Sequence, residues 1–499
     1  MKVPRILIGA VSSGSGKTLI TCALLQALCD RGQHPAAFKC GPDYIDPMFH
    51  RKVLGVPSKN LDTFFTGETM TKKLLAEPQI FDKSGEWKQD ISIIEGVMGL
   101  YDGLGGIREE GSAYHLAKVT KTPVVLIIDA HGMGKSLLAV IAGFLAYDRE
   151  HLIKGVILNR TSKMFFQTIK PEIENSFPIA ALGYFPKQEQ LSFESRHLGL
   201  KLPEEIEDIR EKIKCAAKSL QETVDIGKLL EIAGTAEEIE EENQETVGEI
   251  EKGERIETAG EAEEGEGIET DLGENSETTA QDAGDSKKKV SIAVAYDEAF
   301  CFYYEDNLRL LEKLGAEILS FSPLHDTHIP DNAAAVLLGG GYPELYAEKL
   351  AENEAMKRDM REKIQGGMPA IAECGGFMYL HETLENMEGQ RFPMVGVVPA
   401  DCHYQGKLVR FGYVEIWEKK QNFLQEGEKI KGHEFHYFDS TANGGGCVAE
   451  KPVSGRMWDC VWNQGNCWFG FPHLYYYSNP AFARSFIEKA RNYQKKEKL

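Results

Sequence analysis

The sequence lacks several features that would place it in other classes of protein. No apolar run comes near the roughly 20 residues needed to cross a membrane, so we expect no membrane span. The apolar run ending at Ile8 leads into a glycine-rich turn without a cleavage site, and we expect no signal peptide. None of the ten cysteines forms a Cys-x-x-Cys pair, which favours free thiols in a reducing cytoplasm.

Excess positive charge is also missing. The net charge is −21, but residues 235–286 alone hold 20 Asp and Glu against two Lys and Arg, which leaves about −3 for the rest. The sequence therefore gives no reason to expect nucleic-acid binding. The acidic stretch has no aromatic residue and too little apolar material to fold, so we predict a disordered acidic linker over residues 234–288.

A chain of 499 residues is too long for one core, and the linker divides it into predicted domains 1–233 and 289–499. In both, apolar strands alternate with helical stretches, which predicts two doubly wound parallel sheets of the α/β class. The expected strands of the first domain are residues 2–10, 36–40, 90–94, 123–129, 155–160 and 181–186. Those that begin the second domain are residues 290–295, 316–321 and 335–338, followed by a strand that ends before Cys374.

The first predicted strand leads into a phosphate-binding loop. A helix follows the loop, whose residues are Ser13, Gly14, Ser15, Gly16, Lys17 and Thr18. Its backbone amides and the helix N-terminus can cradle phosphates, Lys17 can reach the outer phosphates, and Thr18 can ligate Mg²⁺. Val11 replaces the usual first glycine, but the strand, loop and helix context favours ATP binding over a fortuitous turn.

Polar residues also follow the next two predicted strands. Asp43, Tyr44 and Asp46 lie on a proline-stiffened loop that suits a ligand site. Glu95 ends the third strand, where a second Mg²⁺ contact belongs, and Asp102 lies in the same glycine-rich loop. The alternative for each acid is a turn or helix cap.

A separate acid, Asp62, is predicted only as a helix cap.

Cys374 lies at a turn between an apolar strand and an apolar helix. Such a turn exposes the thiol at the carboxyl edge of the sheet, where backbone N–H groups stabilise a thiolate and a developing oxyanion. The N–H groups of Gly340 and Gly341, after an earlier strand, could complete an oxyanion hole with that of Gly375. The alternative is a small buried cysteine before a glycine turn.

A thiolate nucleophile needs a base, and several histidines are open to that role. We favour His473, just past a late apolar strand, over His433 and His436, which share one face of a predicted strand. His381 is discounted because we expect it inside the helix that follows Cys374. For each histidine the alternative is a hydrogen-bonded structural residue.

Seven segments, in this order along the chain, resemble the cobyrinate a,c-diamide synthases. They are residues 13–18, 38–47, 196–200, 297–304, 339–345, 372–376 and 432–437. The resemblance implies an ATP-dependent, glutamine-hydrolysing ligase of corrinoid and cobalamin biosynthesis. The first domain is similar to dethiobiotin synthetase and the second to class I glutamine amidotransferases.

The resemblance also implies roles for the residues. Cys374 would form a thioester with glutamine and release ammonia, while His473 moves the proton. Lys17, Thr18 and Glu95 would hold the phosphates and Mg²⁺ while the a and c acetate groups of cobyrinate are phosphorylated and then amidated.

Further roles follow by analogy with dethiobiotin synthetase. Lys39 would face the reacting phosphate and Asn159 would read the adenine, while Asp43, Asp46 and Asp102 order the loops around the acceptor. Ammonia must cross between the domains.

The sequence departs from the class I pattern in one respect. Leu474 and Tyr475 follow His473, where many of these enzymes have Pro-Glu, so the third triad member is unnamed. A nickel-sirohydrochlorin a,c-diamide synthase is an alternative, because its macrocycle also carries paired acetates. Another is a P-loop regulatory ATPase with an inactive glutaminase-like domain, against which the intact Cys374 turn and Lys17 argue.

Overall fold

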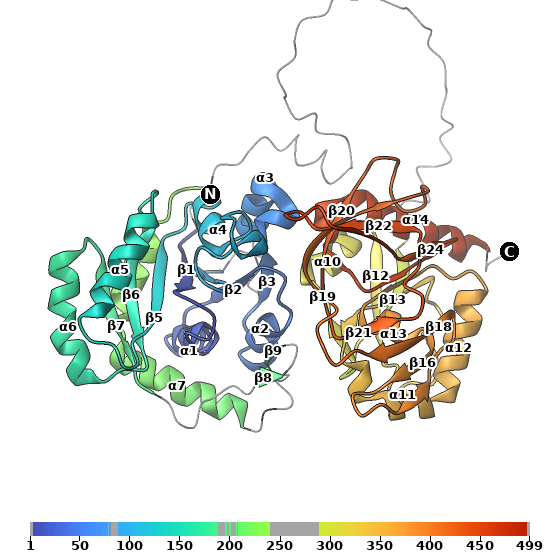
Figure 1. Cartoon of the computed structure of the whole chain (residues 1–499), viewed down its shortest axis with the longest axis horizontal. Coiled ribbons are helices and arrows are strands. Elements are labelled where there is room, and N and C mark those ends of the chain that lie inside the picture. Colours follow the sequence, from blue (N-terminus) through green and yellow to red (C-terminus); the bar gives the residue numbers. More distant parts are fainter. Residues whose placement is uncertain are drawn as a thin grey trace, which may run out of the picture.

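The computed structural model describes residues 3–77, 79–80, 88–187, 195–196, 199–200, 206, 208–239 and 289–496. These residues form two α/β domains that lie side by side (Figure 1). Most of the predicted linker, residues 240–288, lies outside the described residues. Within the described part of the chain, no helix has both the length and the apolar character that a membrane crossing requires.

The N-terminal domain is built on seven parallel strands in the order β3-β2-β4-β1-β5-β6-β7. The strands are β1 Arg5–Ala10, β2 Pro35–Cys40, β3 Ser58–Leu61, β4 Ile91–Glu95, β5 Val124–Asp129, β6 Ile153–Asn159 and β7 Ala180–Phe185. A short pair, β8 Ser195–Arg196 and β9 Gly199–Leu200, stands apart from this sheet. The central strands are buried on both faces, which explains their continuous apolar sequence.

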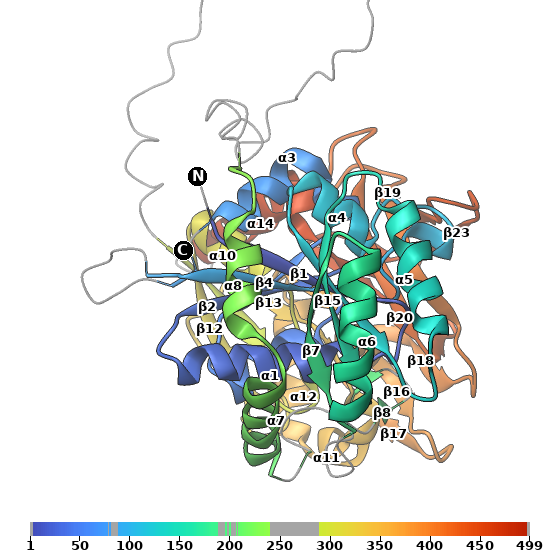
Figure 2. The same ribbon diagram turned by 90° about the vertical axis from the view of Figure 1, so that its left-hand side faces the viewer.

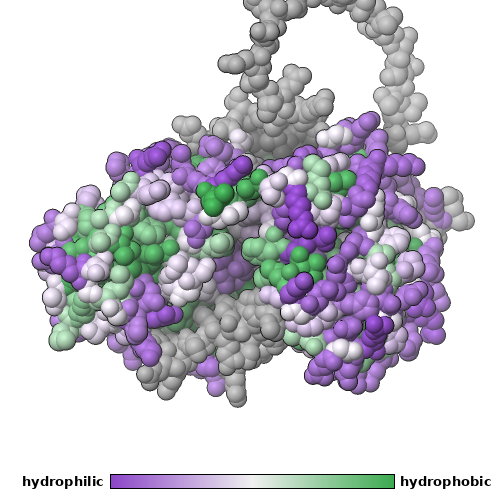
Figure 3. Space-filling view, viewed as in Figure 1, coloured by the Kyte–Doolittle hydropathy of each residue, from purple (hydrophilic) through white to green (hydrophobic). Residues whose placement is uncertain are grey.

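Helices cover both faces of this sheet (Figure 2). One face packs against α1 Lys17–Asp30, α7 Ile209–Thr223 and α8 Ile226–Gly234. The other packs against α3 Thr63–Ala76, α4 Ala113–Val119, α5 Ser136–Tyr147 and α6 Lys163–Ser176. Short turns, α2 Ile45–Met48, a π-helical turn Phe49–Val53 and a 3-10 turn Leu104–Gly106, complete the domain. Figure 3 shows apolar surface over α5, a helix that contains no charged residue and buries only Leu137 and Ile141.

The doubly wound prediction is confirmed for this domain, but β3 was not predicted. Its sequence, Ser-Lys-Asn-Leu, has no apolar run, yet all four residues are buried. The side chain of Asn60 donates to the carbonyl oxygens of Gly41 and Asp43, and Lys59 forms ion pairs. Partners that are distant in sequence therefore satisfy the polar groups of β3.

The C-terminal domain contains a six-stranded sheet in the order β12-β10-β13-β15-β25-β24. Its strands are β10 Val290–Ala295, β12 Ala316–Phe321, β13 Ala335–Leu338, β15 Ala370–Glu373, β24 Trp462–Gln464 and β25 Cys467–Gly470. All pairs are parallel except the last, β24 with β25. Its helices are α10 Glu305–Lys313, α11 Ala347–Glu352, α12 Glu354–Gln365, α13 Gly375–Tyr379 and α14 Pro480–Lys496, with 3-10 turns Pro343–Leu345 and Tyr476–Ser478.

Further sheets, the first of them mixed and the other two antiparallel, add to this domain more strands than the sequence indicated. Their orders are β17-β16-β18-β21, β23-β22-β19-β20-β26 and the pair β11-β14. Their strands are β11 Phe300–Phe302, β14 Gly340–Gly341, β16 His381–Glu385, β17 Arg391–Pro393, β18 Val398–Tyr404, β19 Arg410–Glu418, β20 Ile430–His436, β21 Phe438–Ser440, β22 Cys447–Glu450, β23 Met457–Cys460 and β26 His473–Leu474.

One expectation about this region was wrong. His381 does not lie inside the helix after Cys374, because α13 ends at Tyr379 and His381 begins β16. Its ring is fully buried, with Nδ1 hydrogen-bonded to the Phe377 carbonyl and Nε2 to the Ser440 hydroxyl. His381 is therefore a structural residue, as the sequence analysis concluded for a different reason.

The two domains share a buried, partly ionic interface. Lys59 of the N-terminal domain lies 3.5 Å from Asp306 of the C-terminal domain, and Glu77 lies 2.5 Å from Lys313. Lys59 and Glu77 are themselves 2.5 Å apart, so four charges of alternating sign form one cluster. Beside it, the Phe65 ring stacks on Tyr475 at a centroid distance of 5.0 Å.

Two further hydrogen bonds cross the interface. The Tyr413 hydroxyl donates to Asp62 over 2.6 Å, and Lys431 donates to the Phe64 carbonyl oxygen over 2.7 Å. Asp62 also accepts from the backbone N–H groups of Phe64 and Phe65, which confirms it as the cap of α3. The start of α3 is therefore fixed by both domains.

Packed residues continue past α8 into the segment predicted to be disordered. The Arg5 guanidinium, which is fully buried, donates to the Glu237 carbonyl oxygen over 2.7 Å. Ile239 is also buried in the core. The folded part of the N-terminal domain therefore reaches at least residue 239.

We expect Lys59→Met to destabilise the protein by about 3 kcal/mol or more, because removing one member of a buried ion pair leaves the other charge uncompensated. The measurement is the midpoint of thermal unfolding, which should fall by several degrees. Lys313→Met is the control: Lys313 is 40% exposed, and its loss should change stability by about 1 kcal/mol or less. Equal effects of the two substitutions would contradict this account of the interface.

Candidate active sites

The predicted phosphate loop lies between β1 and α1. Gly14 and Gly16 have φ angles of 76° and 93°, which favour glycine. A Cβ atom on Gly16 would also lie 2.2 Å from Asn159 Nδ2. Lys17 begins α1, and its ammonium donates to the Met98 carbonyl oxygen. Burial and the nearby Lys39 lower the pKa of Lys17 to about 8.

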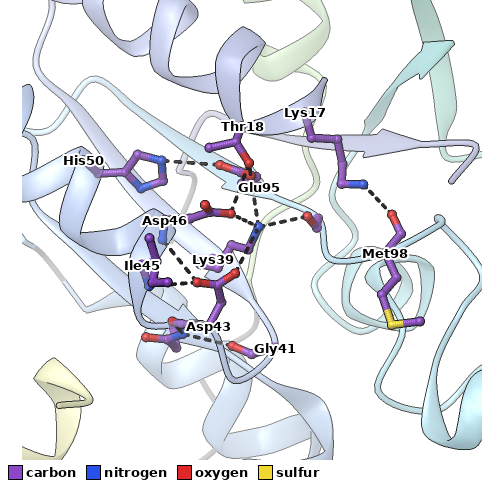
Figure 4. A network of polar contacts seen from close by, with 12 residues as sticks. Lys17, Thr18, Lys39, Gly41, Asp43, Ile45, Asp46, His50, Glu95 and Met98 are labelled. Carbon is purple, nitrogen blue, oxygen red and sulfur yellow. Dashed lines mark hydrogen bonds and ion pairs between the residues drawn. The ribbon is translucent and has the colours of Figure 1, made fainter. Parts of the chain in front are cut away.

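A network of buried charges lies next to this loop (Figure 4). Lys39, at the end of β2, forms ion pairs with Asp46 and with Glu95, the latter at 2.9 Å. The Thr18 hydroxyl lies 2.8 Å from Glu95 and 3.2 Å from Asp46. The structure thus brings together four residues that the sequence placed in separate segments.

Burial and charge oppose each other within this network. Burial favours the neutral forms, but Asp46 and Glu95 raise the pKa of Lys39 well above its ordinary value. For Glu95, Lys39 and His50 outweigh burial and hold its pKa below the ordinary value. Burial and the neighbouring acids raise the pKa of Asp46. Lys39 therefore stays cationic and Glu95 anionic.

The same oxygens can be tested as a magnesium site. Thr18, Asp46 and Glu95 offer only oxygen donors, which Mg²⁺ prefers. Among the described residues Glu95 Oε2 accepts no hydrogen bond of normal geometry, although His50 Nε2 lies 3.4 Å away. Across the described part of the chain, no group of three or more His, Cys, Asp and Glu side chains forms a metal site by itself. The residues fit an ion that takes its remaining ligands from phosphate and water.

Three other predicted site residues of this domain form hydrogen bonds to backbone groups. Asp43 accepts from the N–H groups of Ile45 and Asp46, which start α2, and Asp102 accepts from Gly99 N–H. The Asn159 side chain donates to the Ser15 carbonyl oxygen over 2.8 Å and so supports the phosphate loop. Its predicted contact with adenine stays a prediction.

In the C-terminal domain, the predicted strand, turn and helix around Cys374 is confirmed. Cys374 connects β15 to α13 with φ 46° and ψ −102°, a strained conformation for a residue with a side chain. Its N–H donates to the Gly470 carbonyl oxygen. A Cβ on Gly375 would lie 3.0 Å from Gly341 N, so β14 and the turn are in close contact. The predicted oxyanion residues are thus brought together.

His473 lies close to β14, the strand that contacts the Cys374 turn. It begins β26, and a Cβ on Gly340 would lie 2.3 Å from His473 Cε1. His433 is its direct neighbour across the β20–β26 pair. His436 is committed elsewhere, since its ring stacks on Phe471 at 4.0 Å and its Nδ1 hydrogen-bonds to the Phe438 carbonyl.

Burial keeps both reacting groups neutral at rest. It lowers the pKa of His473 to about 3, with a smaller effect from His436. Burial, together with Glu344, raises the pKa of the Cys374 thiol above its ordinary value. A neutral imidazole can accept a proton and a neutral thiol can give one, so the two groups have the chemistry of a base and a nucleophile.

Sequence reasoning missed the contact that joins the two sites. The Tyr44 ring, on the loop that carries Asp43 and Asp46, lies 5.2 Å from the His473 ring across the domain interface. It also packs against Tyr304 at 4.5 Å and Phe302 at 5.2 Å. The sequence placed Tyr44 only on a ligand loop, and no signal in it links that loop to His473.

Two family models match the chain and define its class. Residues 6–200 match the CobQ/CobB/MinD/ParA nucleotide binding domain, and residues 291–475 match the CobB/CobQ-like glutamine amidotransferase domain. The chain therefore joins a nucleotide-binding domain to a glutamine amidotransferase domain.

Similar full-length proteins identify the family. Relatives named cobyrinate a,c-diamide synthase include one from Caldanaerobacter subterraneus, which is 36% identical over 98% of this chain and 99% of its own length. Another from Listeria innocua is 37% identical over 96% and 97%, and one from Thermoplasma volcanium is 35% identical over 100% of both. The chain belongs to the cobyrinate a,c-diamide synthase family.

We expect the affinity for ATP to fall as the pH rises through about 8, because Lys17 loses its positive charge there. Below pH 8 Lys17 is protonated and can contact phosphate; above it, affinity should drop by up to roughly tenfold per pH unit. Calorimetric titration with a non-hydrolysable ATP analogue between pH 7 and 9.5 measures this. Lys17→Arg keeps its charge and should bind without that slope; an equal slope in both proteins would contradict the prediction.

Proposed function

We propose that the chain catalyses ATP-dependent amidation of the a and c acetate carboxylates of cobyrinate, with glutamine or ammonia as nitrogen source. We assign residues 1–233, together with the packed residues up to 239, to the synthetase domain and residues 289–499 to the glutaminase domain. The strongest support is that relatives bearing this name match both halves over nearly their whole length.

In the glutaminase domain, Cys374 Sγ attacks the carboxamide carbon of glutamine. His473 takes the thiol proton and gives it to the leaving nitrogen, so that ammonia departs and a thioester remains. Water then hydrolyses the thioester to glutamate and restores the thiol. We assign the oxyanion to the N–H groups of Gly341 and Gly375, which is supported by the close contact of the two residues: a Cβ atom on Gly375 would lie 3.0 Å from Gly341 N.

The acid Glu344 supports this assignment. It is buried, and its charge raises the pKa of the Cys374 thiol, so it lies within electrostatic reach of the nucleophile. The α-ammonium group of glutamine would offset that charge. Binding of the substrate would then also remove part of the penalty for forming a thiolate.

In the synthetase domain, an acetate oxygen of cobyrinate attacks the γ-phosphorus of ATP, which releases ADP and leaves an acyl phosphate. Ammonia then displaces phosphate to form the amide. The loop amides and Lys17 hold the phosphates, and Lys39 offsets negative charge as the phosphoryl group moves. Thr18 and Glu95 would hold Mg²⁺, which would neutralise charge on the phosphates.

Ammonia released at the glutaminase site must reach the synthetase site. The loop that starts at Gly41 lies between these two sites. At one end Asp46 joins the Lys39 network beside the phosphate loop. At the other, the Tyr44 ring covers His473. We place the ammonia route along this loop, because it is the segment that contacts both sites.

We expect Cys374→Ser to lose glutamine-dependent amidation by 10³-fold or more while keeping amidation with ammonium chloride, because only the supply of ammonia is removed. Lys17→Ala should lose both activities, since ATP is needed with either nitrogen source. The measurement is the mass of the product formed from cobyrinic acid and ATP, which shifts with each amide added. If folded Cys374→Ser loses both activities, the two-site assignment is wrong.

We expect Tyr44→Ala to uncouple the reactions, because removing the ring opens the interface beside His473 to water. Glutamate formed per amide should rise several-fold above the wild-type ratio. Tyr44→Phe keeps the stacked ring and should retain wild-type coupling. Glutamate and amide are quantified in the same reaction; an unchanged ratio in Tyr44→Ala would exclude this loop as the route.

A further inference from the structure

Two polar atoms next to the nucleophile have no hydrogen-bond partner within the described residues. They are Nδ1 of His473 and Oε1 of Glu373, the residue before Cys374, and both side chains are buried. The other oxygen of the carboxyl group, Glu373 Oε2, lies 3.9 Å from His473 Nδ1. Buried polar atoms without partners are uncommon and point to an interaction that forms during function.

No other charged group competes for Glu373. In the described part of the chain, His473 is the one ionic partner of Glu373. The tyrosines whose titration responds to it are Tyr44, Tyr303, Tyr304 and Tyr476, and burial raises the pKa of all four, so they stay neutral. The Leu474 N–H, next to His473, also interacts with the carboxyl group.

We propose that Glu373 is the third member of a Cys374–His473–Glu373 triad, acting as a positioning residue that accepts a hydrogen bond from His473 Nδ1–H. This inference rests on the glutaminase reaction proposed above. In many class I amidotransferases the acid of the triad lies two residues after the histidine. Here Glu373 would take that place, from the strand that ends at the nucleophile. With Nδ1–H held in this way, Nε2 is left as the acceptor for the thiol proton.

The proton balance requires an ionised Glu373. The thiol proton moves to His473 Nε2, and the imidazolium donates Nδ1–H to the carboxylate, which offsets its charge. The proton then leaves on ammonia, and Glu373 is unchanged. A protonated Glu373 could instead donate to Nδ1, which would put the ring hydrogen on Nε2 and block proton transfer from sulfur.

Burial determines the pH at which Glu373 ionises. It raises the pKa of Glu373 to about 8, so the carboxyl group is largely protonated at neutral pH. Other titratable groups around His473 include Tyr44, His433 and His436. Burial raises the pKa of Tyr44 and lowers that of His433, and His436 disfavours protonation of both His433 and His473. Glutamine-dependent turnover should therefore rise with pH through about 8.

The test is Glu373→Gln, which keeps the shape of the side chain but not its charge. We expect kcat with glutamine to fall by roughly 10²–10⁴-fold, the KM for glutamine to change little, and the rise with pH near 8 to disappear. Amidation with ammonium chloride in the same preparation should stay at the wild-type rate. Glu434→Gln is the matched control: Glu434 is equally buried but lies beside His436, and this variant should keep the rise near pH 8.

A double-substitution cycle separates positioning from a structural role. In a His473→Ala background, Glu373→Gln should cost nothing further with glutamine, because its effect acts through His473. If Glu373→Gln does not fold, Glu373→Asp enters the same cycle. Wild-type turnover and pH profile in a folded Glu373 variant, or additive losses in the cycle, would overturn the proposal. Loss of ammonia-dependent activity in Cys374→Ser would instead contradict the proposed function, whatever Glu373 does.

Discussion

The packing of Tyr44 against His473 is the contact on which the rest of the arrangement depends. Tyr44 lies on a loop whose conformation is set inside the N-terminal domain, where Asp43 caps the following turn and Asp46 joins Lys39. His473 lies on a strand set inside the C-terminal domain. The ring contact is possible only when both domains are folded and docked, so the surroundings of His473 include a side chain that the other domain holds in place.

Burial at and beside this interface decides how charge is arranged. Lys39 has Asp46 and Glu95, and Lys59 has Glu77 and Asp306, so each buried cation has acids within reach. Unpaired buried charge is strongly unfavourable, and these pairings are the expected result. Glu373 differs from these acids, because within the described residues its one ionic partner is a histidine that burial keeps neutral. Exceptions of this kind concentrate at catalytic sites, where a charge develops during the reaction.

The sequence predicted the features that are local. Apolar runs marked six of the seven strands of the first sheet, and the phosphate loop, the Cys374 turn and the Asp62 cap followed from short motifs. It did not predict β3, whose polar residues are satisfied by partners that are distant in sequence. It also did not predict the mixed and antiparallel sheets from β16 to β23, whose half-buried strands carry short patterns. The position of His381 and the contact of Tyr44 with His473 depend on tertiary packing. The hydrophobic periodicity of a single sequence gives no information about either.

The resting state of the glutaminase site follows from the same burial. A strained Cys374 turn presents the sulfur, yet burial holds the thiol neutral, keeps His473 unprotonated and raises the pKa of Glu373 to about 8. The unprotonated His473 suits a proton acceptor, whereas the raised pKa values of Cys374 and Glu373 oppose the thiolate and the carboxylate. Any event that brings positive charge near the site favours the thiolate and the Glu373 carboxylate together.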